Sequence, residues 1–512
     1  MTTKLGPVAR LRNSAILLTS CLASCGDGGG TSASTPNAPA ATSSTSPSSG
    51  PTNPIVTINT AVAGATIAAD AIGTNMAIWY DFTQPGVTAQ TEALGAHMVR
   101  WPGGSGSDQY HWQTGTGCNG QYVAPNTSFD NFVADIVKPA KLDVAITLNY
   151  GSNATCTGGA DPNEAAAWVA HAKALGLTGL HWTVGNEVYG SWEYDLHAKP
   201  HDPATYAGAV AGASGYYQLI KAQDSTANVG VVVTGNNTTW DAIVLANAPY
   251  DFVELHYYAQ NPGNENDTNL LTQGPAQLTA LIKSVQSALA TAGKPNTPIY
   301  LGEFNSVSSN PGKQSVSIVN GLYAGMALGE VLNAGLPMAT WWQGIGAGCS
   351  TGGNNATSLY GWQNFGSYGQ MADTWPNPYG CAGAPSIPQG TLMPSGQAMA
   401  LVSQFAIAGN HMLPIAIPST LPLVRGYAAT QGSGYSVLLV NLDQNNPATV
   451  TLQLQGATQT QFSVSTISYG KAQYDTSQSN VWTPPVTSAL GNTNATPSIT
   501  LPAWSLTVVQ LK

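Results

Sequence analysis

Residues 141–187 read KLDVAITLNYGSNATCTGGADPNEAAAWVAHAKALGLTGLHWTVGNE. The runs Lys141–Tyr150 and Leu180–Glu187 are apolar and strand-like. Between them, Asn163–Leu175 is an Ala-rich stretch of good helix formers. A strand, a helix and a second strand at this spacing are typical of a parallel βαβ unit. This stretch therefore predicts an α/β fold built on a parallel sheet.

The same alternation continues on both sides of this unit. Six more strand-like runs are expected, at Ala71–Tyr80, His97–Gly104, Asn228–Gly235, Asp251–Tyr258, Pro298–Asn305 and Leu336–Gly344. Helical stretches separate several of them, at Pro203–Ala222, Pro275–Ala292 and Gln314–Ala334. Short strands that alternate with helices in this way predict a (β/α)8 barrel, the TIM barrel.

After about residue 410 the pattern changes. Alternation rich in Thr and Val replaces the helical periodicity, in Ser436–Asn441, Ala448–Leu454, Phe462–Ile467 and Ser498–Gln510. These runs predict an appended C-terminal β-sandwich, which a strand at Ile55–Asn59 is expected to join. We therefore expect a catalytic barrel at residues 55–410 and a β-sandwich domain at residues 411–512.

The N-terminal segment, residues 1–25, is typical of a signal peptide. Basic residues precede a short apolar core at Ser14–Ala23. Leu22-Ala23-Ser24-Cys25 then resembles a bacterial lipoprotein cleavage box, in which the Cys25 thiol accepts a lipid; a box that ends at Cys21 fits nearly as well. Residues 26–54 consist mainly of Gly, Ser, Thr, Pro and Ala, which predicts a disordered tether. The expected location is the cell surface or periplasm, as a lipoprotein, or otherwise the medium.

Composition excludes some classes of partner. Only 8% of the residues are charged and the formal net charge is −10. No run of Lys and Arg forms a footprint for nucleic acid, so that class of partner is not expected. No stretch of about 18 apolar residues follows the N-terminal segment, so a transmembrane helix is not expected either. Membrane attachment is expected only through a lipid on Cys25.

The chain has six cysteines. If Cys21 is removed and Cys25 is lipidated, four remain: Cys118, Cys156, Cys349 and Cys381. Four cysteines in an oxidising compartment can form two disulfides. Three connectivities are possible, and proximity in the sequence favours Cys118–Cys156 and Cys349–Cys381. The spacings do not match a zinc site, so no metal is expected.

Two glutamates stand at the ends of expected barrel strands. Leu180–Glu187 ends in Glu187, and Pro298–Asn305 carries Glu303 near its end. Barrel enzymes have their active sites at these C-terminal strand ends, so the two carboxyls should face one bowl. Hydrolysis of a glycoside needs one protonated carboxyl for the leaving oxygen and one ionised carboxyl to attack the anomeric carbon or activate water. A single buried Glu could be structural, but a pair on these strands favours catalysis.

These residues resemble clan A of the glycoside hydrolases, in which Asn-Glu ends the fourth strand and a second Glu lies on the seventh. Further segments are similar to family 51 and to relatives such as family 39: Val99-Arg100-Trp101-Pro102-Gly103-Gly104, His111-Trp112, Gly185–Trp192 (GNEVYGSW) and His256-Tyr257-Tyr258. The resemblance covers roughly residues 70–345. One departure is Phe304 after Glu303, where family 51 commonly has Trp.

The resemblance implies roles for these residues. Glu187 would be the acid/base, Glu303 the nucleophile, and Asn186 would bind the sugar 2-hydroxyl. It implies a retaining O-glycosyl hydrolase without metal or organic cofactor, most similar to an α-L-arabinofuranosidase that acts on plant cell-wall polysaccharide. Two alternatives stay open, an endo-β-glycanase (glucanase or xylanase) and a non-catalytic surface protein that captures polysaccharide.

Six other polar or aromatic residues are candidates for substrate binding or positioning. Arg100 is expected to pair with Glu303 and keep it ionised. His256 and Tyr258 are expected to orient the nucleophile or to contact sugar hydroxyls. Trp342 offers an indole face to a sugar ring. Asn149 and Tyr150 are the last two residues of the third expected strand, and both are expected to line the bowl.

Four nearby residues are expected to have other roles. One of the two tryptophans, Trp341 or Trp342, is expected to pack in the core and not to contact the sugar. Glu254 precedes His256 by two residues, so a regular strand points both side chains the same way, and Glu254 is expected to be a buried structural acid. Glu193 and Asp195 follow the Asn-Glu motif on a loop, and are expected to face substrate or solvent.

Overall fold

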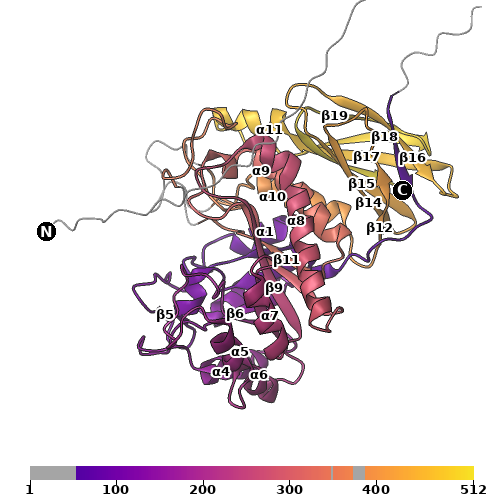
Figure 1. Cartoon of the computed structure of the whole chain (residues 1–512). Helices are drawn as coiled ribbons and strands as arrows, with labels where there is room; N and C mark the ends of the chain where they lie inside the picture. The colour runs from indigo at the N-terminus through magenta and orange to yellow at the C-terminus, as the bar shows by residue number, and fades with distance from the viewer. Residues whose placement is uncertain (1–52, 347–349, 373–386) are drawn as a thin grey trace, which may run out of the picture. The chain divides into compact units, whose positions relative to one another are not determined.

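The computed structural model describes residues 53–346, 350–372 and 387–512. Eight parallel strands close a barrel in the order β10-β11-β2-β3-β6-β7-β8-β9 (Figure 1). Their bounds are β2 Gly73–Asn75, β3 Met98–Trp101, β6 Asp143–Leu148, β7 His181–Val184, β8 Asn228–Val233, β9 Phe252–Gln260, β10 Ile299–Val307 and β11 Met338–Trp341. Each expected run overlaps one of these strands, although β9 and β10 extend two residues beyond the expected ends, so the predicted (β/α)8 barrel with an appended β-sandwich is confirmed.

Helices follow the barrel strands in chain order and cover the outside of the sheet (Figure 1). They are α1 Val87–Ala93, α2 Phe129–Phe132, α3 Lys138–Ala140, α4 Pro162–Ala174, α5 Pro203–Ala211, α6 Tyr216–Gln223, α7 Thr238–Asn247, α8 Asp267–Thr291, α9 Ile318–Asn333 and α10 Pro394–Phe405. Several begin where the sequence offers an N-cap. Asp161 accepts a hydrogen bond from the Asn163 amide at 2.9 Å, and Asp202 accepts one from Thr205 at 2.8 Å.

Two expected helices differ from the observed ones. The stretch Pro203–Ala222 forms two helices, because the chain leaves the helical conformation at Gly212, where ψ is 154°. α8 begins at Asp267 rather than Pro275, since Asn266 caps it at 2.9 Å and Pro275 lies inside the helix. Proline is more common in the first helical turn, so the sequence pattern suggested the later start.

β9 and β10, with nine residues each, are the longest strands of the barrel. The pairing of these strands shifts register between Leu301 and Glu303, which is a local bulge at Gly302. Only Gly fits at this position, because a Cβ on Gly302 would lie 2.1 Å from the Glu254 carboxyl oxygen. The bulge thus allows the Glu254 carboxyl and Glu303 to share the C-terminal end of the barrel.

The C-terminal region contains two further sheets, of orders β13-β1-β16-β19 and β12-β14-β15-β20-β17-β18. Their strands are β1 Ile55–Asn59, β12 Met412–Leu413, β13 Ile415–Ala416, β14 Val424–Gln431, β15 Gly434–Asn441, β16 Ala448–Gln455, β17 Gln461–Gly470, β18 Val486–Asn494, β19 Ser498–Leu501 and β20 Ser505–Leu511. A short helix, α11 Lys471–Thr476, follows β17, and a small hairpin of β4 Tyr110–His111 and β5 Thr116–Gly117 lies near the barrel. Val56, Val437, Leu452 and Val509 belong to the core between the two sheets.

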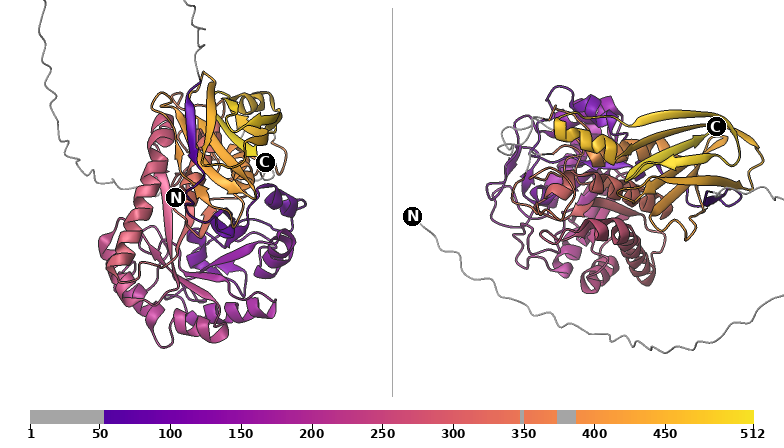
Figure 2. Two further views of the ribbon diagram at one scale, coloured as in Figure 1. Left: turned by 90° about the vertical axis from the view of Figure 1, so that its right-hand side faces the viewer. Right: turned by 90° about the horizontal axis from the view of Figure 1, so that it is seen from above.

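The strand expected at Ile55–Asn59 does join the sandwich, because β1 pairs in parallel with β16 (Figure 2). The run Ser498–Gln510 was expected to be one strand and is two. The chain turns at Pro502–Trp504, so that β19 pairs with β16 in one sheet and β20 pairs with β15 and β17 in the other. Proline cannot donate to a ladder, which favours the break at this point.

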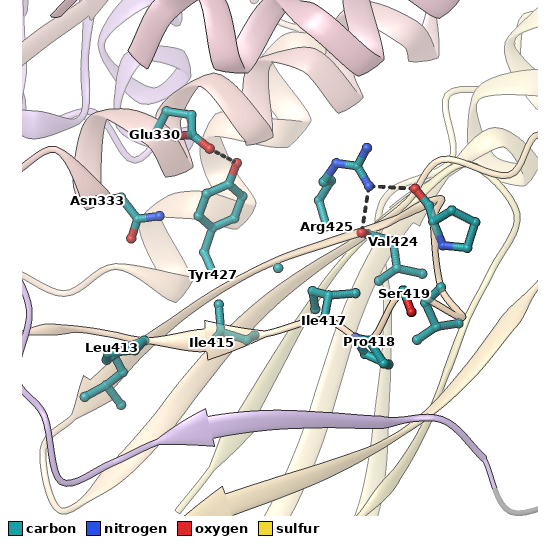
Figure 3. Close-up of a pocket in the computed structure, with 14 residues that line it drawn as sticks. Glu330, Asn333, Leu413, Ile415, Ile417, Pro418, Ser419, Val424, Arg425 and Tyr427 are labelled. Carbon is teal, nitrogen blue, oxygen red and sulfur yellow. Dashed lines mark hydrogen bonds between the residues drawn. The ribbon is translucent and has the colours of Figure 1, made fainter. Parts of the chain in front are cut away.

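The sandwich contacts the barrel helices through Tyr427 on β14. Its hydroxyl donates to the Met326 carbonyl at 3.1 Å and to Glu330 Oε1 at 2.8 Å, both on α9. Gly329 makes room for the Tyr427 ring, because a Cβ there would lie 2.5 Å from it. Figure 3 shows the pocket of about 550 Å³ beside this contact, with Arg425 at its edge. These contacts indicate that the sandwich braces α9.

The disulfide Cys118–Cys156 is present and links the segments after β5 and β6. The other expected disulfide, Cys349–Cys381, lies outside the described residues, as do Cys21 and Cys25. Within the described part of the chain, no helix is both long and apolar enough to cross a membrane.

Candidate active site

Glu303 lies near the C-terminal end of β10, and its side chain is almost completely buried. Oε1 accepts hydrogen bonds from Arg100 Nη1 at 2.8 Å and from the Gly104 amide at 3.2 Å. Oε2 accepts one from the Tyr258 hydroxyl at 2.6 Å. Oε2 has fewer donors than Oε1, so it is the oxygen with a lone pair free for a ligand.

Arg100, at the end of β3, is the central cation of the site and is fully buried. Besides Glu303, it reaches Glu254 Oε1 through Nε at 2.9 Å, Asn186 Oδ1 through Nη2 at 2.9 Å, and Asn75 Oδ1 through Nη1 at 3.0 Å. Burial works to lower the pKa of Arg100, but the charges of Glu254 and Glu303 raise it above its ordinary value. The contact between Arg100 and Glu303 that the sequence predicts is therefore part of a larger network.

We expect Arg100→Met to destabilise the fold by about 3–5 kcal/mol, because Glu254 and Glu303 would be left buried without their shared cation. The measurement is the free energy of unfolding in urea. Lys283→Met is the matched control, since Lys283 is exposed on α8 and forms no ion pair with any residue that the structure describes. Equal stability of the two variants would contradict the prediction.

His256 lies between two carboxyls on the same face of the barrel. Its Nδ1 is 3.0 Å from Glu187 Oε1, and its Nε2 is 2.9 Å from Glu254 Oε1. Burial works to lower the pKa of His256, but Glu303, Glu187 and Glu254 raise it to about 10. Both ring nitrogens face carboxylate acceptors, which also requires a proton on each. His256 is thus an imidazolium, and Glu254 shares its side of the strand as expected.

Glu187 follows β7 and is within reach of Glu303. One oxygen of each glutamate and a ring nitrogen of His256 lie within 4.8 Å of one another. Glu187 Oε2 accepts a hydrogen bond from the Trp192 indole at 2.9 Å. Burial works to raise the pKa of Glu187, but the hydrogen bond and charge of His256, with the Trp192 bond, hold it below its ordinary value. The proton of the Glu187–His256 pair therefore lies on His256.

The side of the site between β11 and β3 is aromatic. Trp342 packs against Trp79 edge to face at 5.9 Å. Its ring also covers Gly104, where a Cβ would lie 2.5 Å from the indole and φ is +68°. Gly104 is thus needed both for the turn and for room beneath Trp342. Trp341 is the packing tryptophan of the pair, since it is fully buried against Phe304 at 5.0 Å.

Three of the remaining candidates are engaged in holding loops. The Asn149 amide donates to the Tyr110 carbonyl at 3.2 Å, and its Oδ1 accepts from the Ser152 amide at 3.0 Å. Tyr150 is buried and stacks on His197 at 4.2 Å. Asp195 was expected to face substrate or solvent, but its buried carboxylate accepts from the His197 amide at 2.9 Å. A short loop needs such acceptors for its backbone amides, which draws Asp195 inward.

The expectation for Glu193 is also wrong in part, because its residue is only 5% exposed. Two functional residues were missed altogether. Asn75, at the end of β2, orients Arg100, and Asp108 accepts from the Asn186 amide at 2.9 Å. For Asn75 a signal existed, since a polar residue at a buried strand end in a barrel points to the bowl. For Asp108, which follows the Gly-rich turn after β3, no local pattern sets it apart.

A pocket of about 870 Å³ opens beside Glu187, on the side of β7, β8 and β9. Trp192, which is 66% exposed, forms part of its wall, and His256 and Tyr258 reach it from β9. The rest of its lining consists mainly of neutral polar and aromatic residues, among them Tyr189, Thr234, Asn236, Asn237, Gln277 and Ser284. No Lys, Arg, Asp or Glu lines this pocket among the residues described. The positive charge of His256, which also lines the pocket, is already paired with Glu187 and Glu254, so the pocket suits a neutral ligand.

The donor set does not favour a metal ion. Glu187, His256 and Glu303 are close enough to ligate one, but the two ring nitrogens of His256 are both committed to carboxylates as N–H donors. A second group, His111 with Cys118 and Cys156, has its sulfurs in the disulfide. Among the described residues, the arrangement of Glu187, His256 and Glu303 thus suits proton transfer between these side chains better than metal binding.

The sequence matches no family model and no curated protein. Solved structures do share its fold. A family 51 α-L-arabinofuranosidase from Thermotoga petrophila has 16% identity and a TM-score of 0.66, over 89% of this chain and 99% of that one. A β-xylosidase from Caulobacter crescentus has 15% identity and a TM-score of 0.62, over 90% and 99%. A bifunctional glucanase-xylanase from a metagenome library has 15% identity and a TM-score of 0.60, over 90% of this chain and 99% of that one.

These enzymes all belong to clan A of the glycoside hydrolases. At such identities the likeness concerns the fold, and fold alone does not fix an activity. The resemblance that the motifs indicated is confirmed at this level, and it extends over the barrel and the sandwich together. The chain therefore has the fold of the clan A glycoside hydrolases.

Proposed function

We propose that this protein is a retaining glycoside hydrolase in which Glu303 is the nucleophile and Glu187 the acid/base. The observation that carries the proposal is the pair itself, with carboxyl oxygens within 4.8 Å at the C-terminal end of the barrel. Retaining enzymes have their two carboxyls about 5–5.5 Å apart, whereas inverting enzymes need room for a water between them. The spacing supports the retaining mechanism.

In the first step, Glu303 Oε2 attacks the anomeric carbon and forms a glycosyl ester. Arg100 and Gly104 hold Oε1, so the free lone pair of Oε2 faces the substrate. The glycosidic bond breaks at the same time, and the leaving oxygen takes a proton from Glu187. His256 supplies this proton through its 3.0 Å contact with Glu187, because the developing negative charge on the leaving oxygen draws it across.

In the second step, Glu187 acts as a base. It takes a proton from a water, whose oxygen attacks the anomeric carbon and breaks the ester to Glu303. Two inversions leave the configuration of the sugar unchanged. The proton then passes from Glu187 back to His256, whose Nδ1 lies 3.7 Å from Glu303 Oε2, so the restored positive charge stabilises the departing carboxylate.

The proposed substrate is plant cell-wall polysaccharide, and the proposed activity is that of an α-L-arabinofuranosidase. The α-L-arabinofuranosidases that share this fold support arabinose as the sugar that is released. The edge-to-face pair of Trp79 and Trp342 supports an aromatic surface on which a sugar ring can stack. The neutral pocket beside Glu187 supports an oligosaccharide or polysaccharide as the leaving group, because Glu187 protonates that side.

An endo-β-glycanase is the second candidate. The size of the neutral pocket and the exposed Trp192 favour it, since a platform outside the catalytic centre can hold further sugars of a chain. A third possibility, a protein that only captures polysaccharide, would not need the shared proton of Glu187 and His256.

Hydrolysis of a panel of substrates separates these candidates. The panel contains 4-nitrophenyl α-L-arabinofuranoside, 4-nitrophenyl β-D-xylopyranoside, arabinoxylan, linear xylan and β-glucan. Release of free arabinose without shortening of the main chain is the expected result. A rapid fall in viscosity with no arabinose released would favour the endo-glycanase. Binding of a polymer without any cleavage would contradict the proposed enzyme.

We also propose that the protein is exported and carries a lipid on Cys25. The signal-like segment, the cleavage box and the tether before residue 55 support this, and a disulfide at Cys118–Cys156 suits an oxidising compartment. Mass spectrometry of the mature N-terminus tests it. A diacylated Cys25 is expected, and a mature chain that begins elsewhere without lipid would contradict it.

A further inference from the structure

Glu193 is a buried acid that the proposed mechanism does not use. It lies on the loop after β7, and none of the ion pairs among the described residues includes it. Its Oε1 accepts from Ser105 Oγ at 2.8 Å and from Asn186 Nδ2 at 3.1 Å, while Oε2 is buried without a partner. Burial, and then the charge of Glu187, raise the pKa of Glu193 to about 7. An acid in such a costly environment points to a functional reason.

The contacts of Asn186 show what Glu193 can do. The amide of Asn186 has one acceptor, Oδ1, and Arg100, which has only donors, lies 2.9 Å from it. Nδ2 therefore points to Glu193, which accepts one of its two hydrogens. The second hydrogen of Nδ2 remains for a ligand. Arg100 and Glu193 together thus fix Asn186 as a hydrogen-bond donor toward the site.

The position of Asn186 Nδ2 relative to Glu303 determines which hydroxyl of a bound sugar it can contact. Arg100 binds Glu303 through Nη1 and Asn186 through Nη2, so the two side chains lie side by side on one guanidinium. A sugar whose anomeric carbon faces Glu303 carries its nearest hydroxyl on the adjacent ring carbon. That hydroxyl can donate to the carboxylate and accept from Asn186 at the same time.

We propose that Glu193 is a positioning residue that acts through Asn186, and thereby strengthens the contact with the sugar hydroxyl next to the anomeric carbon. This inference rests on the proposed function. The hydrogen bond to Glu193 also polarises the Asn186 amide. It holds the amide in one orientation before the substrate binds. The Glu193 carboxyl reaches the reaction only through the amide, and Ser105 Oγ donates to the same carboxyl oxygen at 2.8 Å.

The test compares two substrates, 4-nitrophenyl α-L-arabinofuranoside and its 2-deoxy analogue, with spontaneous hydrolysis subtracted. We expect Glu193→Ala to lower kcat/KM about tenfold to a hundredfold on the first substrate, mainly through kcat. On the analogue, which lacks the hydroxyl, we expect a change of less than about twofold. Glu193→Gln keeps an acceptor for Asn186 and should recover most of the activity.

Ser105→Ala is the matched control. It removes the other hydrogen bond of Glu193 Oε1 and leaves the contact with Asn186, so any effect on the loop should be small and equal for both substrates. An equal loss on both substrates with Glu193→Ala would show a merely structural role and overturn the inference. Activity of the wild type on neither substrate, nor on the other members of the panel, would instead overturn the proposed function.

Discussion

Replacement of Glu303 by Ala is expected to lower kcat on the best aryl glycoside by about 10⁴-fold or more, because no other group can form the glycosyl ester. Sodium azide should restore part of the activity. Azide would enter the space of the lost carboxyl and attack the anomeric carbon from the same face. The expected product is a glycosyl azide of inverted configuration, which NMR identifies.

Two controls accompany this variant. Glu303→Gln keeps the size of the side chain and should be equally inactive, which separates the chemistry from the packing around Arg100. Glu164→Ala removes a glutamate that pairs with His111 outside the network of Arg100, and should retain most of the activity. An azide product of retained configuration, or substantial activity of Glu303→Ala, would sink the assignment of the nucleophile.

Replacement of Glu187 by Ala is the second large effect, and it should depend on the leaving group. General acid catalysis contributes about 10²–10⁴-fold, so hydrolysis of polysaccharide should fall by that amount. An aryl glycoside with an acidic phenol needs little protonation, and its first step should remain fast. The glycosyl ester would then accumulate, since no base is left to activate water.

Azide distinguishes this variant from the first. It would attack the accumulated ester from the side of the missing Glu187, so the product should have retained configuration, opposite to that from Glu303→Ala. A burst of nitrophenol in rapid mixing would give the rate of ester formation directly. A loss that is the same for all leaving groups would contradict the role of Glu187 as the acid.

The two glutamates could be located from sequence because their signals are local. Each stands at or near the end of an apolar run, and the rule that barrel sites lie at C-terminal strand ends then brings them together. The contacts that prepare them could not be read in this way. Arg100 and Glu303 are 203 residues apart, and the pairing of Ser105 with Glu193 spans 88.

The acids near the site show where local reasoning fails. Glu193 and Asp195 follow a catalytic motif on a polar loop, so exposure was the natural expectation, yet the fold buries both carboxyls. The proton on His256 is a similar case. Its ordinary pKa gives no hint of a permanent charge, which arises because Glu303, Glu187 and Glu254, from β10, the loop after β7 and β9, surround its ring.

The sequence by itself determined the class of fold, the order of the eight barrel strands along the chain, the addition of β1 to the sandwich and the positions of Glu187 and Glu303. These follow from periodicity and from strand ends, which depend on neighbouring residues. Only the tertiary structure decided the bulge at Gly302, the charge on His256 and the hydrogen bond from Asn186 to Glu193. The reason is physical, because burial and charge at one residue are set by groups that the closed barrel brings from distant strands.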